Sequence, residues 1–236
     1  YQRQMLIKNW GEAGQNKIRQ ASVFIAGAGG LGCPVAMFLA CTGIGRIRLC
    51  DSGVVQFSNL NRQFLYKEWD VGRSKALSAR EFLEEFNPEV TVDVLTDHIE
   101  QENAEQLVGN STVIIDCLDN FKTRHILNKV SVKKQIPLIH AGIEGMSGQI
   151  TFIHPPETPC LYCIYPGNIP CESIFPVTGQ TAGTIGSLEA MEAVKWITGI
   201  GDLLKNRLLV CDFYSMTFHK IDIKKDPRCP VCGLKE

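Results

Sequence analysis

The stretch Gly27-Ala28-Gly29-Gly30-Leu31-Gly32 separates a short apolar run, residues 23–26, from an apolar helical pattern over residues 31–42. Glycines permit a tight strand-to-helix turn and let the free N–H groups of a helix N-terminus approach a phosphate. Nineteen residues after Gly32, a second apolar run ends in Asp51, the spacing expected of an acid that binds a ribose hydroxyl. The glycines alone also fit a turn without a ligand, but with Asp51 they predict a nucleotide site.

Apolar runs and helical patterns alternate along the first part of the chain. This order predicts an α/β fold, a Rossmann-like, doubly wound and mostly parallel sheet with right-handed crossovers. Ligands bind at the carboxyl ends of such strands, where the glycine turn, Asp51 and Asp119 all fall. Strands are expected at 23–26, 47–50, 90–94 (near an edge), 112–116 and 137–140, helices at 31–42, 75–86, 101–108 and from about 121 to 134, and a loop with helical turns at 52–72.

The remainder of the chain has a different pattern. An antiparallel strand is expected at 149–154, a mobile loop rich in Pro, Gly and Thr at 164–182, and a buried helix at 184–197. Two further runs, 208–213 and 218–223, predict a terminal hairpin of antiparallel strands. A length of 236 residues favours one domain with one sizeable core.

The overall charge excludes some partners. The formal net charge is −1, so no whole-chain field favours nucleic acid or an anionic membrane. No apolar stretch is long enough to span a bilayer, and no basic-then-apolar leader precedes the first strand. We therefore expect a cytoplasmic protein with no nucleic-acid or membrane partner. The chain begins at Tyr1, so we also expect that N-terminal residues are missing.

Two Cys-x-x-Cys pairs predict a metal site. Cys160 and Cys163 form the first pair, and Cys229 and Cys232 form the second, with 65 residues between them. Four thiolates complete the closed tetrahedral shell of a structural zinc ion. Because nothing directs export, zinc is favoured over disulfides. The long spacing is typical of a clamp that fixes the C-terminal tail to the body of the protein.

The other cysteines divide into two groups. Cys171 lies in the Pro- and Gly-rich loop, where it could act as a nucleophile if its pKa were lowered, or could be an incidental thiol. The rest fall in core-like patterns, and burial is expected for Cys33, Cys41, Cys50, Cys117 and Cys211.

Polar residues near the strand ends suit a triphosphate and its metal. Arg62 can hold phosphate oxygens through a bidentate fork, and Lys75 supplies a point charge. Asp119 follows a buried strand, where a carboxylate can hold Mg²⁺ between phosphate oxygens. The nearby Asp116 is expected to hydrogen-bond neighbouring loops instead. Each charged residue taken singly could also be a solvated surface side chain.

Taken together, these motifs resemble the MoeB, ThiF and HesA family of molybdopterin-synthase adenylyltransferases and ThiF-type proteins, whose fold also supplies the adenylation domain of ubiquitin-activating enzymes. The resemblance runs from about Tyr1 to Gly233. The motifs that carry it are Tyr1-Gln-Arg-Gln, Gly27-Ala-Gly-Gly-Leu-Gly, Ser58-Asn-Leu-Asn-Arg-Gln63, Val71-Gly-Arg-Ser-Lys75, Asp116-Cys-Leu-Asp-Asn120, Gly148-Gln-Ile, Gly186-Ser-Leu-Glu-Ala-Met-Glu-Ala193 and the two cysteine pairs.

The resemblance implies that ATP and Mg²⁺ activate a carboxylate as an acyl-adenylate and that pyrophosphate is released. The usual carboxylate is the C-terminal glycine of a ubiquitin-like sulfur carrier. Arg3 matches an arginine that the family donates across a homodimer interface. The implied catalytic set is Arg3, Arg62, Lys75 and Asp119, with Cys171 as a further candidate. The implied nucleotide-binding set is Gly27, Gly29, Gly30, Leu31, Asp51, Ser58, Asn59, Arg62, Lys75, Asp119 and Asn120.

The domain is then expected to divide into a nucleotide-binding half, residues 21–143, and a zinc-clamped half, residues 144–236, that binds the acyl substrate or carrier. The segment after Cys171 departs from the family pattern, which leaves open a different acyl substrate. Some relatives activate a peptide terminus or a small carboxylate, such as a pyridinol precursor of a hydrogenase cofactor. Two other classes are an NAD-dependent oxidoreductase, which leaves Arg62, Lys75 and Asp119 unexplained, and a silent scaffold that only docks a carrier.

Overall fold

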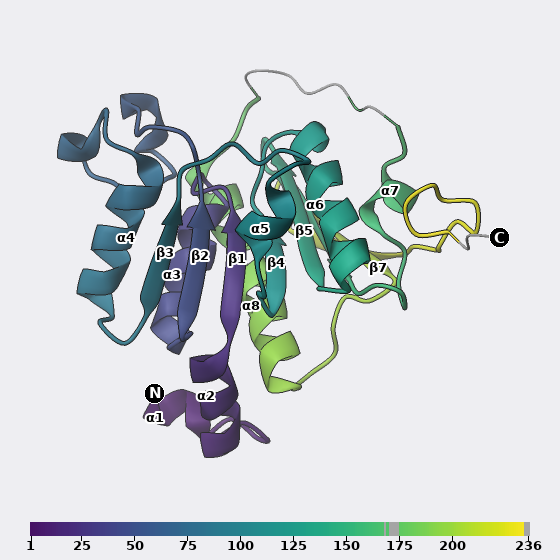
Figure 1. Ribbon diagram of the computed structural model, residues 1–236, viewed down its shortest axis with the longest axis horizontal. Helices are drawn as coiled ribbons and strands as arrows, with labels where there is room; N and C mark the ends of the chain where they lie inside the picture. Colours follow the sequence, from purple (N-terminus) through teal and green to yellow (C-terminus); the bar gives the residue numbers. More distant parts are fainter. Residues whose placement is uncertain (168, 170–174, 234–236) are drawn as a thin grey trace.

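The computed structural model describes residues 1–167, 169 and 175–233. Cys171 and the residues after it, to 174, lie outside this described part of the chain. One eight-stranded sheet has the order β3-β2-β1-β4-β5-β6-β7-β8 (Figure 1). The strands are β1 (Ser22–Ala26), β2 (Arg46–Cys50), β3 (Thr91–Leu95), β4 (Val113–Asp116), β5 (Leu138–Glu144), β6 (Ser147–Ile153), β7 (Arg207–Asp212) and β8 (Thr217–Asp222).

The predicted α/β fold class is confirmed. Strands β1 to β5 pair in parallel, whereas β5–β6, β6–β7 and β7–β8 pair antiparallel. Strand β3 is the edge of the parallel part, as its alternating pattern indicates. The mostly parallel sheet is therefore extended at one side by the antiparallel strands of the second half.

Both faces of the parallel part of the sheet are covered by helices. Val23 and Ile25 of β1 pack into one apolar cluster, and Phe24 and Ala26 pack into another, which explains why this strand is apolar without interruption. Figure 1 shows α5 and α6 in front of the sheet and α3 and α8 behind it. The longer helices are α2 (Gly11–Gln20), α3 (Gly32–Thr42), α4 (Lys75–Phe86), α6 (Phe121–Lys134) and α8 (Gly179–Thr198), and the shorter ones are α1 (Gln2–Met5), α5 (Ala104–Val108), α7 (Leu161–Ile164), η1 (Phe57–Asn59) and η2 (Glu68–Asp70).

Helix α8 begins earlier than the sequence pattern indicates. The predicted loop over residues 164–182 is wrong at its end, because residues 179–182 are helical. Thr178 caps the helix, since its side chain accepts a hydrogen bond from the backbone N–H of Thr181 at 3.2 Å. Within the described residues, no helix is both long enough and apolar enough to cross a bilayer.

The cysteine predictions hold with one exception. Cys33, Cys50, Cys117 and Cys211 are buried as expected, but Cys41 is exposed. Cys41 lies one turn after Phe38 on α3, and Phe38 is itself half-exposed. Residues three positions apart share a helix face, so this prediction is wrong because the last turn of α3 presents these side chains to solvent.

Candidate active site

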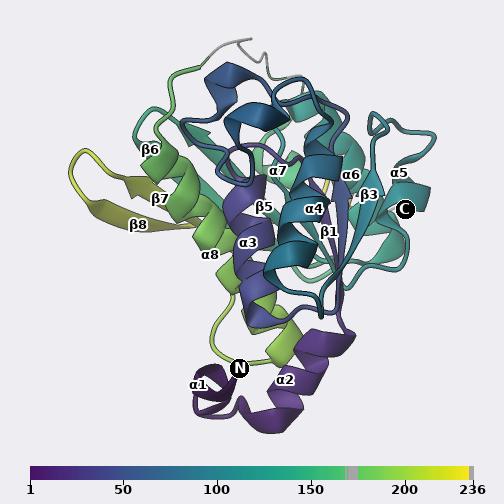
Figure 2. The same cartoon turned by 90° about the vertical axis from the view of Figure 1, so that its left-hand side faces the viewer.

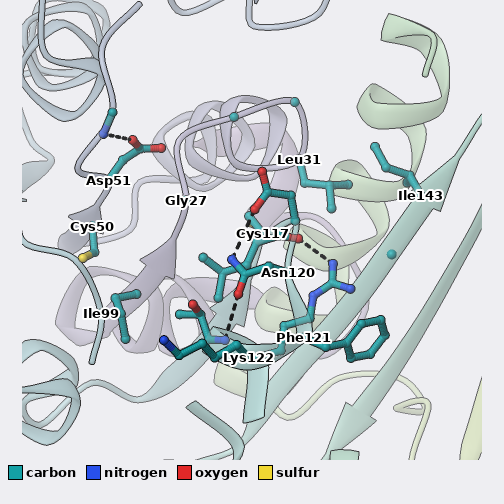
Figure 3. Close-up of a pocket in the computed structure, with 18 of the residues that line it drawn as sticks. Gly27, Leu31, Cys50, Asp51, Ile99, Cys117, Asn120, Phe121, Lys122 and Ile143 are labelled. Atoms are coloured by element: carbon teal, nitrogen blue, oxygen red, sulfur yellow. Dashed lines mark hydrogen bonds between the residues drawn. The ribbon is translucent and has the colours of Figure 1, made fainter. Parts of the chain in front are cut away.

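A cleft of about 1490 Å³ opens at the carboxyl ends of the parallel strands. Figure 3 shows Asp51 and Ile143 on either side of it, with Leu31, Cys117 and Asn120 between them. Most of the residues predicted to bind the nucleotide line this one cleft, namely Gly27, Gly29, Gly30, Leu31, Asp51, Asn59, Arg62, Lys75, Asp119 and Asn120.

Two predicted residues do not line the cleft. Ser58 contributes its backbone carbonyl, which accepts a hydrogen bond from Arg62 Nη1 at 3.0 Å. Arg3 lies on α1, which Figures 1 and 2 place at the opposite end of the sheet, beyond the amino ends of the strands. Arg3 of this chain is therefore far from its own cleft.

The glycine turn brings the backbone close to the cleft. Gly27 has a φ of +96°, and a Cβ there would lie 2.7 Å from the carbonyl oxygen of Cys117. A side chain at Gly32 would lie 2.0 Å from the carbonyl oxygen of Gly27. Only glycine fits at these positions. The turn therefore leaves the backbone N–H groups before α3 open to an anion.

Asp51 stabilises this turn and faces the cleft. Its Oδ2 accepts a hydrogen bond from Ala28 N at 2.7 Å, and its Oδ1 accepts one from Gly53 N at 2.7 Å. An ionised carboxylate has about four acceptor sites, so lone pairs remain for ribose hydroxyls. The sequence spacing did not indicate that Asp51 also fixes the glycine turn.

The cations differ in how they are held. Arg62 Nη1 bonds Ser58 O and Asn61 Oδ1, at 3.0 and 2.9 Å, and its side chain lies 3.6 Å from where a Cβ on Gly30 would stand. Lys75 begins α4, and within the described residues its ammonium group has no hydrogen-bond or ion-pair partner. A lysine that lines a cleft without such a partner suits an anionic ligand.

The loop of residues 117–119, hereafter the Asp119 loop, lies between β4 and α6. Asn120 caps α6, since its Oδ1 accepts from Thr123 N at 2.9 Å, and its Nδ2 donates to Asp119 Oδ1 at 3.3 Å. Asp119 lines the same cleft as the glycine turn. A carboxylate there provides the oxygen ligand that Mg²⁺ prefers, so this residue fits a metal bound with a triphosphate.

Asp116 hydrogen-bonds its neighbours, as predicted. It is fully buried, accepts hydrogen bonds from Leu118 N and His140 Nδ1, and forms an ion pair with Arg124, whose Nε lies 3.4 Å from its Oδ2. Burial alone would raise its pKa, but the Arg124 charge, His140 and the amide together lower the pKa below its ordinary value. The sequence reasoning missed Arg124 and His140. Two features could have indicated them: an arginine one turn after a helix cap, and a histidine within an apolar, buried strand.

The far side of the cleft is a floor formed by β5 and β6, hereafter the β5–β6 floor, which comprises Gly142, Ile143, Ser147 and Gln149. Val177 lies beside this floor, because it forms an isolated β-bridge with Gly145. Gly142 has no side chain to fill this part of the cleft, and a Cβ there would lie only 3.3 Å from Gln149 Nε2. The β5–β6 floor thus offers room beside the nucleotide residues for a second, extended substrate.

The four paired cysteines converge. Their sulfur atoms all lie within 4.8 Å of one another, with Cys160 Sγ 3.7 Å from Cys229 Sγ and Cys163 Sγ 3.5 Å from Cys232 Sγ. Zinc–sulfur bonds of about 2.3 Å in a tetrahedron place sulfurs about 3.8 Å apart. The cluster therefore fits a zinc ion and joins α7 to the C-terminal tail.

Comparison with known proteins gives a consistent result. The ThiF family model matches residues 1–231. The chain is 37% identical to the protein HesA, heterocyst, of Trichormus variabilis, over 99% of this chain and 88% of that protein. It is also 37% identical to the sulfur carrier protein adenylyltransferase of Thermus thermophilus, over 99% of this chain and 90% of that one.

Solved structures agree with the sequence relatives. The structure of E. coli MccB with ATP superposes with a TM-score of 0.85 at 26% identity, covering 94% of this chain and 69% of that one. E. coli MccB with MccA-N7isoASN gives a TM-score of 0.87 at 25% identity, over 94% of this chain and 70% of that one. The cleft, the fold and the match over nearly the whole chain show that this protein belongs to the ThiF family and is an ATP-dependent adenylyltransferase that activates a carboxylate.

Proposed function

We propose that this enzyme adenylates the C-terminal glycine carboxylate of a small ubiquitin-like sulfur carrier. A carboxylate oxygen of the carrier attacks the α-phosphorus of ATP, the bond between that phosphorus and the bridging oxygen breaks, and pyrophosphate leaves with the electron pair. The observation that carries the proposal is one cleft that joins the nucleotide residues to the β5–β6 floor.

Each group has a role in this step. Gly27 to Leu31 and Asp51 bind the nucleotide, with Asn59 and Asn120 as supporting polar groups. Arg62 and Lys75 stabilise the charge that develops on the phosphates, which is usually the largest catalytic contribution. Mg²⁺, when bound by Asp119, offsets the charge of the triphosphate and the leaving pyrophosphate.

A protein substrate is supported by the edge of the sheet. All residues of β8 are exposed, including Phe218 and Ile221, and β8 is the last strand of the sheet. Figure 2 shows the β7–β8 hairpin projecting from the body. An exposed edge strand can pair with a strand of a partner. The relatives named for sulfur carriers favour a carrier as this partner.

Four further assignments belong to the same proposal. Residues 21–143 form the nucleotide-binding half, and residues 144–236 form the half that binds the carrier. The four cysteines hold a structural zinc ion that fixes the tail to α7. A homodimer brings Arg3 of one chain to the cleft of the other, since Arg3 cannot reach its own. Cys171 lies outside the described residues and remains a candidate, from the sequence alone, for covalent transfer.

A peptide or a small carboxylate is the second candidate. The superposition on MccB, whose solved structures include complexes with peptides, favours it. The two candidates differ in what the β8 edge contributes. A short peptide or a small molecule would need the cleft alone, whereas a carrier would need the edge strand too.

The test is pyrophosphate exchange into ATP with each acyl substrate. We expect exchange with a small ubiquitin-like sulfur carrier that ends in glycine, and none with the same carrier when its C-terminal carboxyl is amidated. Exchange with a free peptide terminus or a small carboxylate, but not with carriers, would replace this proposal with the second candidate. Binding of NAD without binding of ATP would refute both.

A further inference from the structure

A buried polar cluster lies beside the Asp119 loop, outside the set of nucleotide-binding residues predicted above, and one of its members, Arg124, also lines the cleft. It consists of Asp116 at the end of β4, His140 on β5 and Arg124 on α6. Asp116 and His140 are fully buried, and Arg124 is 7% exposed. Burying charged groups is costly unless they are paired and hydrogen-bonded, so the arrangement of this cluster requires a reason.

Arg124 joins two segments that are remote in sequence. Its Nη2 donates a short hydrogen bond to the carbonyl of Leu118, at 2.5 Å, and another to the carbonyl of Ala141, at 2.9 Å. Leu118 belongs to the Asp119 loop, and Ala141 directly precedes Gly142 of the β5–β6 floor. One guanidinium group therefore ties the proposed metal carboxylate to the floor on which the acyl substrate would lie.

Asp116 orients this guanidinium from below. Its Oδ2 lies 3.4 Å from Arg124 Nε and 2.7 Å from His140 Nδ1, and its Oδ1 accepts from Leu118 N at 3.1 Å. Because an ionised carboxylate can only accept, the proton of His140 lies on Nδ1. Both oxygens of Asp116 are thus engaged inside the protein, and Asp116 holds the Asp119 loop directly as well as through Arg124.

The ring of Phe121 completes the constraint, because Arg124 Cζ lies 5.1 Å from its centroid. A planar fork that bonds two carbonyls and stacks on an aromatic ring cannot be replaced by a lysine. Asp116 and Phe121 thus hold the guanidinium in place, and its two carbonyl contacts join the Asp119 loop to the strand that forms the β5–β6 floor.

We propose that Arg124 is a positioning residue for adenylyl transfer, which, oriented by Asp116, fixes the Asp119 carboxylate relative to the β5–β6 floor. The inference rests on the proposed function, since it takes Asp119 as the Mg²⁺ ligand. Groups that support metal ligands from behind typically change metal affinity or activity by about 10- to 100-fold when mutated.

The experiment measures how strongly Mg²⁺ enhances ATP binding, by calorimetry with ATP at a series of Mg²⁺ concentrations. For Arg124→Lys we expect ATP affinity without Mg²⁺ within about 2-fold of wild type, because the nucleotide residues are untouched. The enhancement by Mg²⁺ should fall by about 10-fold or more. Lys133→Gln, which removes a cation from the exposed face of the same helix, should behave as wild type.

Asp119→Asn separates this inference from the proposed function. If Asp119→Asn leaves the Mg²⁺ enhancement intact, Asp119 is not the ligand and that part of the proposed function fails. If Asp119→Asn abolishes the enhancement while Arg124→Lys retains it in full, the positioning role is wrong.

A second variant keeps the inference testable if Arg124→Lys does not fold, and a double variant sharpens the test if it does. Asp116→Asn weakens the same support while preserving its shape, and it should reduce the Mg²⁺ enhancement in the same direction. In a double variant, Arg124→Lys should have no further effect once Asp119 is changed to Asn, because coupled residues are not additive. Additive losses would mean that Arg124 does not act through Asp119.

Discussion

The two ends of the cleft are built on different principles. At the nucleotide end, backbone geometry decides the site: a glycine at φ +96°, a carboxylate bonded to two amides, and cations at the ends of adjacent elements. At the far end, the β5–β6 floor, the bridge to Val177 and the exposed β8 edge offer an extended surface. The difference suggests that one end recognises an invariant ligand, ATP, whereas the other receives a partner through shape and strand pairing.

The largest effects on activity are expected from substitutions at the nucleotide end. Lys75→Ala or Asp119→Ala should each reduce carrier-dependent pyrophosphate exchange by about 10²- to 10³-fold or more, because each removes charge stabilisation at the phosphates. The thermal melting curve should stay close to that of wild type, since both side chains line the cleft. Exchange that stays within about 3-fold of wild type in both variants would contradict the site assignment.

Substitutions at the far end should change the KM for the carrier instead of the rate of the chemical step. Phe218→Ala and Ile221→Ala on β8 should raise the KM for a carrier by about 10-fold, the effect of losing a moderate interface contact. The KM for ATP should not change. Phe86→Ala, which removes an equally exposed aromatic from the end of α4, serves as the control. An unchanged KM for the carrier in both β8 variants would argue for a substrate that uses the cleft alone.

Removal of the proposed zinc ion from the cysteine cluster should lower stability without changing nucleotide binding. Cys229→Ser, or chelation of zinc, should release the tail from α7 and lower the melting temperature by more than about 4 °C, a loss of more than about 1 kcal/mol. ATP affinity should stay within about 2-fold, because none of the four cysteines lines the cleft. A fall in ATP affinity well beyond 2-fold, together with the lower melting temperature, would show that the cysteine cluster also supports the nucleotide site.

The smallest predicted effect concerns Glu189, which lies on α8 beneath the nucleotide end. Glu189 is fully buried, and within the described residues its Oε1 has no hydrogen-bond partner. Burial, and then the charge of Asp116, raise its pKa well above the ordinary value of 4.5. The folded state therefore keeps this proton to a higher pH than the unfolded state, and stability falls as the pH rises above about 4.5.

Glu189→Gln cannot ionise, so it should remove this loss. Its melting temperature relative to wild type should increase from pH 5 to pH 8, by at least the 2–4 °C that about 1 kcal/mol produces in a domain of this size. ATP affinity should stay the same at both pH values. A relative melting temperature that does not change with pH would mean that Glu189 is already ionised in the folded protein.

The same contrast explains what could be predicted from the sequence. Strand ends in a parallel sheet meet at one edge, so Gly27, Asp51 and Asp119 could be placed together without a structure. The bond between Asp116 and His140 joins two adjacent strands across 24 residues, and no local pattern indicates which buried polar groups will pair. The contacts of Arg124 were missed for the same reason.

Other differences have local causes. Helices α1 and α2 were not predicted. Their burial is limited to residues such as Gly14 and Ile18 of α2, so few apolar residues mark these helices in the sequence. The first turn of α8 was assigned to a loop because its glycine and its threonine have low helix propensity, but the cap formed by Thr178 stabilises the helix start. Cys41 was expected to be buried because its neighbours are apolar, although part of α3 faces solvent.

The most direct test of the central claim is the mass of a carrier after incubation with this enzyme, ATP and Mg²⁺. The carrier should gain the mass of AMP less one water at its C-terminal glycine, and the enzyme with Asp119→Ala should leave it unmodified. A carrier that stays unmodified while the wild-type enzyme binds both it and ATP would contradict the account, since the cleft would then bring the two together without joining them.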